Sequence, residues 1–122
     1  MKRDMELIRK ILLNIEGDKH DLRGTYTGDQ VGYHLGLLID GGYITQYFHG
    51  KEHPHWVGGF KCDMTYTLTW KGHDFIEATR NESFFKKCLA ELKEKAVPVT
   101  FGLVLEYIKA KAKEQLGIGN AE

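Results

Sequence analysis

The chain has 122 residues, of which 42% are hydrophobic and 28% are charged. This size and composition are typical of one soluble globular domain with its own hydrophobic core, and they exclude a wholly disordered chain. Lys and Arg together number 17, as do Asp and Glu, so the formal net charge is zero. A neutral chain attracts neither nucleic acid nor anionic lipid through its overall charge.

Charged residues interrupt the apolar segment near the N-terminus, which excludes a signal-peptide core, and no apolar run is long enough to cross a bilayer. The two cysteines, Cys62 and Cys88, lie far apart and form no CxxC motif. We therefore expect a cytoplasmic protein without membrane contact in which both thiols are reduced, a single disulfide being the alternative.

Two helices are predicted in the first third of the chain. The first covers residues 3–15, where apolar side chains recur at helical spacing and a glycine follows as a stop. Residues 18–27 are mostly polar and predict a turn and a short strand. The second helix covers residues 28–40, because Thr27 and Gln30 have the spacing of a capping box and two glycines follow its end.

The middle of the chain predicts a β-hairpin. Residues 43–49 are rich in aromatic and β-branched side chains, which favours a strand, and residues 50–59 form a turn-rich loop. Extended structure resumes over residues 60–70. There, large apolar side chains alternate with threonines and predict a strand with one buried face, made of Met64, Tyr66, Leu68 and Trp70. The two strands and their loop have the geometry of a wing.

Three helices are predicted after the hairpin. Each has a capping residue placed before it: Thr69, Asn81 or Ser83, and Thr100. An apolar stripe runs along the second of these helices, and Glu91 is spaced to pair with Lys87 and Lys95, one turn away on either side. Residues 118–122 are expected to form a disordered tail.

Three segments resemble known families. The segment VGYHLGLLIDGGYI (31–44) resembles the stretch of winged-helix domains where a helix ends in a glycine turn and the chain enters the wing, and LTWKGHDF (68–75) looks like the LTxxGxxF that follows the second wing strand. With the opening MKRDMELIRKILLNIE, these segments are similar to an uncharacterised bacterial and phage family, domain of unknown function twenty-five-thirteen. The resemblance covers nearly the whole chain and implies a winged-helix-like fold, but no particular activity.

The predicted fold is therefore α+β and mainly α. It is a winged-helix-like domain, in the order helix, short strand, helix, β-hairpin wing and helix, extended by two additional C-terminal helices. We expect one such domain over residues 1–117.

A winged-helix fold raises the hypothesis of DNA binding, with residues 28–40 in the major groove. That helix contains no Lys or Arg, and residues 17–80 hold six basic side chains against eight acidic ones. The candidate DNA contacts are Gln30, His34, Lys51 and Lys61. DNA is thus a disfavoured partner. A DNA-binding transcription regulator that uses the wing and a basic patch generated by a dimer is the alternative function.

Neither a metal site nor a catalytic site is expected. Four potential zinc ligands lie in or beside the hairpin, but their spacing matches no standard zinc signature: His49, His53, His55 and Cys62. His73 and Asp74 are neighbours on a predicted helix and point in different directions, so they form no catalytic pair. The sequence also lacks a nucleophile elbow, a phosphate-binding glycine loop and a paired-carboxylate motif. We therefore expect a protein that is not an enzyme and has no cofactor.

Aromatic side chains are concentrated in the hairpin and in the helix before it, and such clusters are typical of protein interfaces. Several of these rings could equally close the core of a small domain. The candidate interaction surface consists of Tyr33, Tyr47, His55 and Trp56. The favoured hypothesis is a regulatory or adaptor module that acts through protein–protein contact, with an unknown protein partner or as a homodimer.

Overall fold

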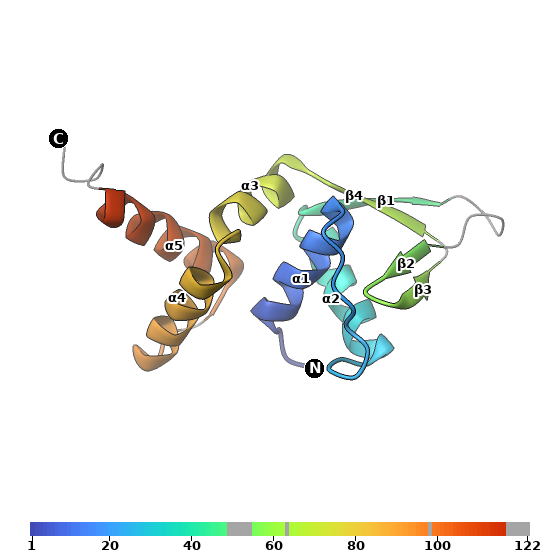
Figure 1. Cartoon of the computed structure of the whole chain (residues 1–122), viewed down its shortest axis with the longest axis horizontal. Coiled ribbons are helices and arrows are strands. Elements are labelled where there is room, and N and C mark those ends of the chain that lie inside the picture. The colour runs from blue at the N-terminus through green and yellow to red at the C-terminus, as the bar shows by residue number, and fades with distance from the viewer. Residues whose placement is uncertain (49–54, 63, 98, 117–122) are drawn as a thin grey trace. The chain divides into compact units, whose positions relative to one another are not determined.

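The computed structural model describes residues 1–48, 55–62, 64–97 and 99–116 (Figure 1). Within these ranges, the structure does not describe the side chains of Phe48, His55, Lys61, Cys62 and Leu116. The described residues form five α-helices and two antiparallel sheets of two strands each, which confirms the predicted α+β, mainly α, fold class.

The chain divides into two compact units, residues 1–76 and residues 77–122, and the boundary falls inside helix α3 (Trp70–Thr79). The expectation of one domain over residues 1–117 stays a prediction. The predicted tail, residues 118–122, lies outside the described residues.

Helix α1 (Met5–Glu16) is largely buried in the first unit. The Oδ1 of Asp4 accepts hydrogen bonds from the backbone N–H groups of the first turn, at 3.0 and 3.1 Å, and Gly17, with a φ of 120°, ends the helix. Helix α1 contacts α2, β2 and β4. These contacts on several sides explain why its buried residues include Leu7 and Leu13 as well as the predicted apolar face.

Helix α2 (Gly28–Asp40) begins with the predicted capping box. The N–H of Gln30 donates to Oγ1 of Thr27 at 3.1 Å, and the N–H of Thr27 donates to Oε1 of Gln30 at 2.8 Å. Gly42, with a φ of +81°, follows the last turn. The capping residues thus set the start of α2 as the sequence predicts.

The strands differ in detail from the predicted single hairpin. Strand β1 (Ile44–Phe48) pairs with β4 (Met64–Leu68), with Ile44 opposite Leu68 and Phe48 opposite Met64. Between them in the sequence, β2 (His55–Val57) and β3 (Phe60–Cys62) form a second antiparallel pair. The loop predicted over residues 50–59 therefore contains a strand, and the strand predicted over residues 60–70 is divided and ends at Leu68.

The turn between β2 and β3 explains why residues 60–62 pair with β2. Gly58 and Gly59 both have positive φ, 57° and 97°, as a tight two-residue hairpin turn requires. The backbone O of Gly58 accepts a hydrogen bond from the N–H of Leu22 at 2.8 Å, and Leu22 is buried. Residues 18–27 form turns that are anchored on this hairpin, and the predicted short strand is not observed there.

A close packing contact joins the end of α2 to the start of α3. The hydroxyl of Thr69 donates to the backbone O of Gly42 at 2.6 Å and accepts from the N–H of Gly72 at 3.2 Å. A Cβ atom on Gly72 would lie 2.2 Å from the backbone O of Tyr43, so this position requires glycine. We call this contact, made by residues 41–43 with residues 69–75, the junction.

Side chains complete the junction. Lys71 Nζ donates to the backbone O of Gly41 at 3.1 Å and lies 5.0 Å from the centroid of the Tyr43 ring. The Tyr43 ring in turn meets Phe75 edge to face, at a centroid distance of 6.1 Å. The two glycine-containing segments that resemble winged-helix families therefore pack against each other.

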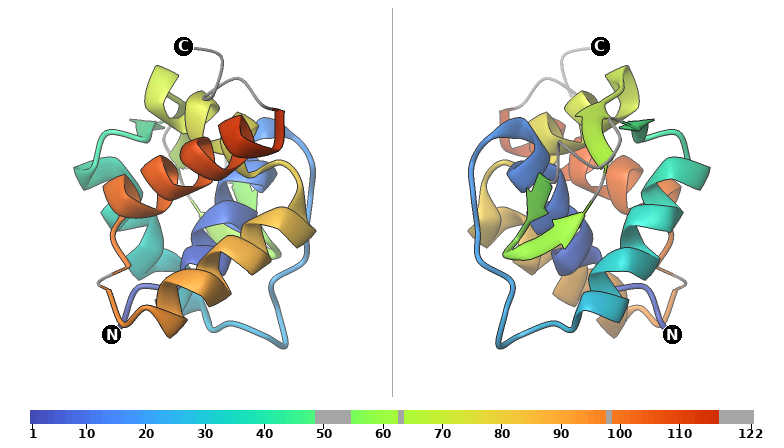
Figure 2. Two further views of the ribbon diagram at one scale, coloured as in Figure 1. Left: turned by 90° about the vertical axis from the view of Figure 1, so that its left-hand side faces the viewer. Right: turned by 90° about the vertical axis from the view of Figure 1, so that its right-hand side faces the viewer.

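The second unit contains α4 (Glu82–Glu94) and α5 (Phe101–Leu116), which pack side by side (Figure 2). Asn81 Oδ1 accepts from the N–H of Phe84 at 3.0 Å, and Thr100 Oγ1 accepts from the N–H of Leu103 at 3.2 Å. Both predicted caps are confirmed. The predicted apolar stripe of α4 is also confirmed, since its buried residues are Phe85, Cys88, Leu89 and Leu92.

Candidate functional site

The exposed large side chains of the first unit occur on several of its elements. Tyr33 on α2 is 39% exposed, Tyr47 on β1 is 53% exposed and Trp56 on β2 is 58% exposed. These are three of the four residues of the predicted interaction surface. The fourth, His55, lies in β2 opposite Cys62 on β3, and its side chain is outside the described atoms.

Trp70 belongs with these residues and was missed by the sequence prediction. It is 85% exposed, whereas the alternation of residues 60–70 predicts it on the buried face of a strand. The prediction is wrong because Thr69 caps α3, so that Trp70 is the first helical residue. The cap itself was the signal that could have placed this ring at a helix start. Tyr33, Tyr47, Trp56 and Trp70 are called the exposed aromatic set below.

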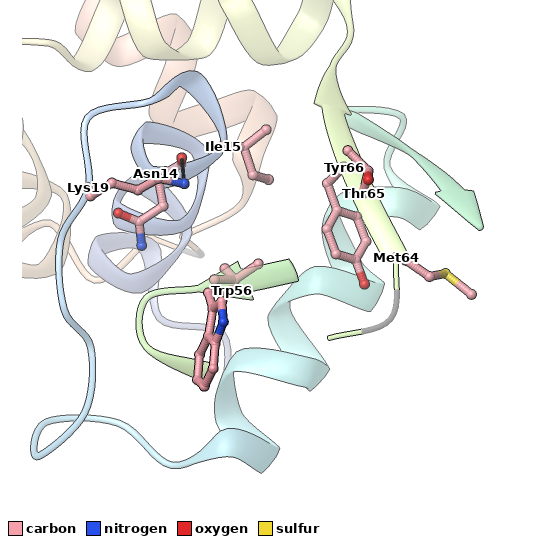
Figure 3. Close-up of a pocket in the computed structure, with 8 residues that line it drawn as sticks. Asn14, Ile15, Lys19, Trp56, Met64, Thr65 and Tyr66 are labelled. Carbon is pink, nitrogen blue, oxygen red and sulfur yellow. Dashed lines mark hydrogen bonds between the residues drawn. The ribbon is translucent and has the colours of Figure 1, made fainter. Parts of the chain in front are cut away.

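A small pocket of about 160 Å³ adjoins Trp56. Figure 3 shows Asn14, Ile15 and Lys19 above Trp56, and β4, which carries Thr65 and Tyr66, to the right of it. This volume is below the range of about 300–1,000 Å³ that is usual for small-molecule sites. The pocket therefore suits a single inserted side chain better than a whole ligand.

The polar groups on the α1 side of this pocket already have partners. The side-chain amide of Asn14 donates to the backbone O of His20 at 3.0 Å and accepts from the N–H of the same residue. Lys19 Nζ donates to the backbone O of Asn14 at 3.1 Å. These bonds hold the loop after α1 in place, which is a structural role.

Two of the candidate DNA contacts are engaged within the protein. His34 is only 1% exposed; its Nε2 accepts from the N–H of Asp4 at 2.8 Å, and its Nδ1 lies 2.7 Å from the backbone O of Gln30. This geometry fits the neutral tautomer with a proton on Nδ1. The side-chain O of Gln30 completes the capping box. Contact of His34 with a base would break its bonds, whereas Gln30 could offer a base only its side-chain NH2 group without losing the cap.

The side chains of the other two candidate DNA contacts, Lys51 and Lys61, are outside the described atoms. Lys51 lies outside the described residues, and the side chain of Lys61 on β3 is not described. The exposed residues of α2 include the two carboxylates Asp29 and Asp40 but no cation. Carboxylates on this face repel phosphate.

In the second unit a polar cluster connects α4 to α5. The Tyr107 hydroxyl donates to Oε1 of Glu91 at 2.7 Å, and Nζ of Lys95 and of Lys111 lie 5.0 and 5.6 Å from the Tyr107 ring centroid. This hydrogen bond lowers the pKa of Glu91 and raises the pKa of Tyr107 to about 12. Glu91 thus bonds across to α5, and the charges of Lys87 and Lys95, one turn away on either side, also lower its pKa.

The described residues contain no group of three or more His, Cys, Asp or Glu side chains that could hold a metal ion. Of the four potential zinc ligands, His49 and His53 lie outside the described residues. Cys88 is a buried free cysteine, and burial raises the pKa of its thiol. Within the described residues, no helix is long and apolar enough to span a membrane.

The fold and the exposed rings together define a small, mainly helical α+β protein with aromatic side chains on the surface of its first unit. The sequence model of the family described as "Hypothetical protein (DUF2513)" matches residues 2–98, and the chain belongs to this family. The resemblance stated from the sequence segments is thereby confirmed.

One curated relative is similar over nearly its whole length. It is an "Uncharacterized protein" of Haemophilus influenzae (strain ATCC 51907 / DSM 11121 / KW20 / Rd), 25% identical over 124 residues, which cover 95% of this chain and 99% of that protein. No solved structure matches the chain. The winged-helix likeness stays a prediction that rests on the order of elements and on the sequence segments.

Proposed function

We propose that this protein is a non-catalytic protein-contact module and that it binds a second copy of the same chain through the exposed aromatic set. The observation that carries the proposal is the exposure of both tryptophans of the chain, Trp56 by 58% and Trp70 by 85%. Burial of such rings against a partner would remove a large apolar area from water, and Trp and Tyr dominate the binding energy of many interfaces.

The first unit does not need these rings for its own core. Its interior already contains fully buried large side chains on α1, α2 and α3, among them Leu12, Leu38 and Phe75. A tryptophan that lies outside a complete core contributes little to folding, and it is available to another molecule.

The zero net charge of the chain favours a second copy of the same chain as the partner. The formal net charge of zero means that two copies do not repel each other as strongly charged chains do. Symmetric dimers are also the commonest assemblies of soluble proteins, because one patch serves both subunits.

DNA binding is the weaker candidate. A helix that recognises DNA bases needs cations and free amide or guanidinium groups. The exposed face of α2 instead carries Asp29, Asp40 and glycines. The bonds within the protein remove His34 from such a surface and occupy the side-chain oxygen of Gln30.

Sedimentation velocity from micromolar to millimolar concentration tests the proposal. We expect concentration-dependent association of the unaltered chain, and a loss of affinity of about ten-fold or more for Trp56→Ala and for Trp70→Ala. His73→Ala, an exposed position on the same helix as Trp70, is the matched control and should associate normally. A chain that stays monomeric over this range, or tryptophan variants that associate as the unaltered chain does, would refute the proposal.

A further inference from the structure

The second unit carries a pocket that is larger than the one beside Trp56 and that the proposed function does not use. It is formed by the last turn of α3, the start of α4 and one face of α5, and its volume is about 440 Å³. This volume lies within the range of about 300–1,000 Å³ that is usual for small-molecule sites. The pocket can therefore accommodate a ligand of several carbon atoms.

Apolar side chains line the inside of this pocket. They include Phe84 from α4 together with Ile108 and Ala112 from α5. Phe84 is only partly buried, although the other large apolar residues of α4 are buried. An apolar ligand placed here would cover a ring that the described part of the chain leaves partly open to water.

The charge at the rim of the pocket is positive. Its one lining carboxylate, Glu77, accepts a hydrogen bond from the Arg80 guanidinium at 2.7 Å, so this charge is already compensated. Lys109 also lines the pocket, and it has no ion-pair partner among the residues that the structure describes. An anionic group next to the apolar surface would therefore meet an available cation.

We infer that this pocket binds a small amphiphilic carboxylate, whose hydrocarbon body contacts Phe84, Ile108 and Ala112 and whose carboxylate pairs with Lys109. The ligand class follows from two properties of the site, an apolar interior and one uncompensated cation at its edge. The inference stands independently of self-association through the first unit, because all residues that line this pocket belong to the second unit.

Titrations of the full chain with three eight-carbon probes test the inference, monitored by backbone amide chemical shifts. The probes are octanoate, octan-1-ol and octyltrimethylammonium, which share the hydrocarbon chain and differ in charge. We expect octanoate to bind with a dissociation constant on the order of 1 mM and to perturb the amides that surround the pocket. Octan-1-ol should bind about two- to five-fold more weakly, and the cation most weakly of all.

Two pairs of variants locate the ligand. Lys109→Met should reduce the affinity for octanoate to that for octan-1-ol, whereas Lys113→Met, an exposed lysine one turn further along α5, should leave it unchanged. Ala112→Leu should fill the pocket and weaken both probes about ten-fold, whereas Ala110→Leu, at an exposed position that does not line the pocket, should not.

The inference is overturned by any of three results. The first is equal binding of octanoate and octyltrimethylammonium. The second is unchanged octanoate affinity in Lys109→Met or in Ala112→Leu, with folding verified by circular dichroism. The third is an absence of amide shifts at roughly 10 mM octanoate, ten times the expected dissociation constant.

Discussion

The junction and the exposed aromatic set lie in the same unit, but their side chains relate to the rest of the chain in opposite ways. At the junction, Thr69, Lys71 and Gly72 each contact residues 41–43 through a hydrogen bond or through a close backbone approach. Trp70 lies between them in the sequence and is 85% exposed.

The contrast between the packed residues of the junction and the exposed Trp70 shows that neighbouring residues of one segment have different roles. The residues of the junction specify where α3 begins and how it packs on the end of α2. The ring of Trp70, which is 85% exposed, adds little to that packing, and the proposed function uses it for contact with another molecule. Substitutions at the two kinds of position should therefore change different properties of the protein, folding stability in one case and association in the other.

The largest effect is expected for Gly72→Ala at the junction. A Cβ atom there would lie 2.2 Å from the backbone O of Tyr43, and such overpacking against backbone should lower the free energy of unfolding by about 3 kcal/mol. Gly36→Ala on α2 is the matched control, because nothing lies within 4 Å of its Cβ position. This control should raise the free energy of unfolding by about 0.5–1 kcal/mol. Urea denaturation measures both, and effects of the same sign would contradict the packing described here.

A smaller loss is expected for Thr69→Ala. This change removes the bond to the backbone O of Gly42 and the cap on the N–H of Gly72, at a cost of about 1–2 kcal/mol. Thr69→Ser keeps the hydroxyl and should retain most of the stability. If the serine and alanine variants unfold at the same urea concentration, the hydroxyl has no part in the junction.

The bond between Tyr107 and Glu91 should make a pH-dependent contribution to stability in the second unit. The pKa of Glu91 is lowered from 4.5, so the contribution is present above that pH and is lost as the pH falls through the lowered pKa. The pKa of Tyr107 is raised from 10.0 to about 12, so the contribution is also lost as the pH rises from 10.0 through 12.

Tyr107→Phe tests this contribution. The variant should be less stable than the unaltered chain near neutral pH, and the difference between the two should disappear at both extremes of pH. Thermal unfolding followed by circular dichroism across this range measures the difference, and a difference that is independent of pH would show that the bond is not formed in solution.

The smallest effects on stability are expected in the exposed aromatic set. Trp56→Ala and Trp70→Ala should change the free energy of unfolding by no more than about 0.5 kcal/mol, as is usual for surface positions. Chemical denaturation at a protein concentration too low for association measures this. A loss above about 2 kcal/mol in either variant would mean that the ring supports the fold.

Helix starts could be predicted from the sequence because their signals are local. Thr27 with Gln30, Asn81 and Thr100 each bond a backbone N–H three residues or fewer away. The pairing of β1 with β4 agrees with the predicted hairpin of residues 43–49 and 60–70, whereas the second pair, β2 with β3, is not predicted by the sequence pattern. The two-glycine turn that separates β2 from β3 was interpreted as part of one long loop.

The candidate site could be predicted only in part, because the exposure of a ring depends on tertiary packing. Tyr47 and Trp56 are exposed as the interaction hypothesis requires, whereas Trp70 was assigned to a strand face by its alternating neighbours. His34 was assigned to a DNA-binding surface and is buried. Its spacing, three residues after Val31 and four before Leu38, places it on the apolar face of α2, and that signal could have identified it.

The fluorescence of the two tryptophans tests the proposed contact most directly, because the chain has no other tryptophan and both are exposed. In dilute solution, acrylamide should quench both efficiently. As the protein concentration rises toward millimolar, we predict that the emission shifts to shorter wavelength and that quenching decreases in parallel with association. Quenching that stays the same from micromolar to millimolar protein would contradict a contact surface built on these two rings.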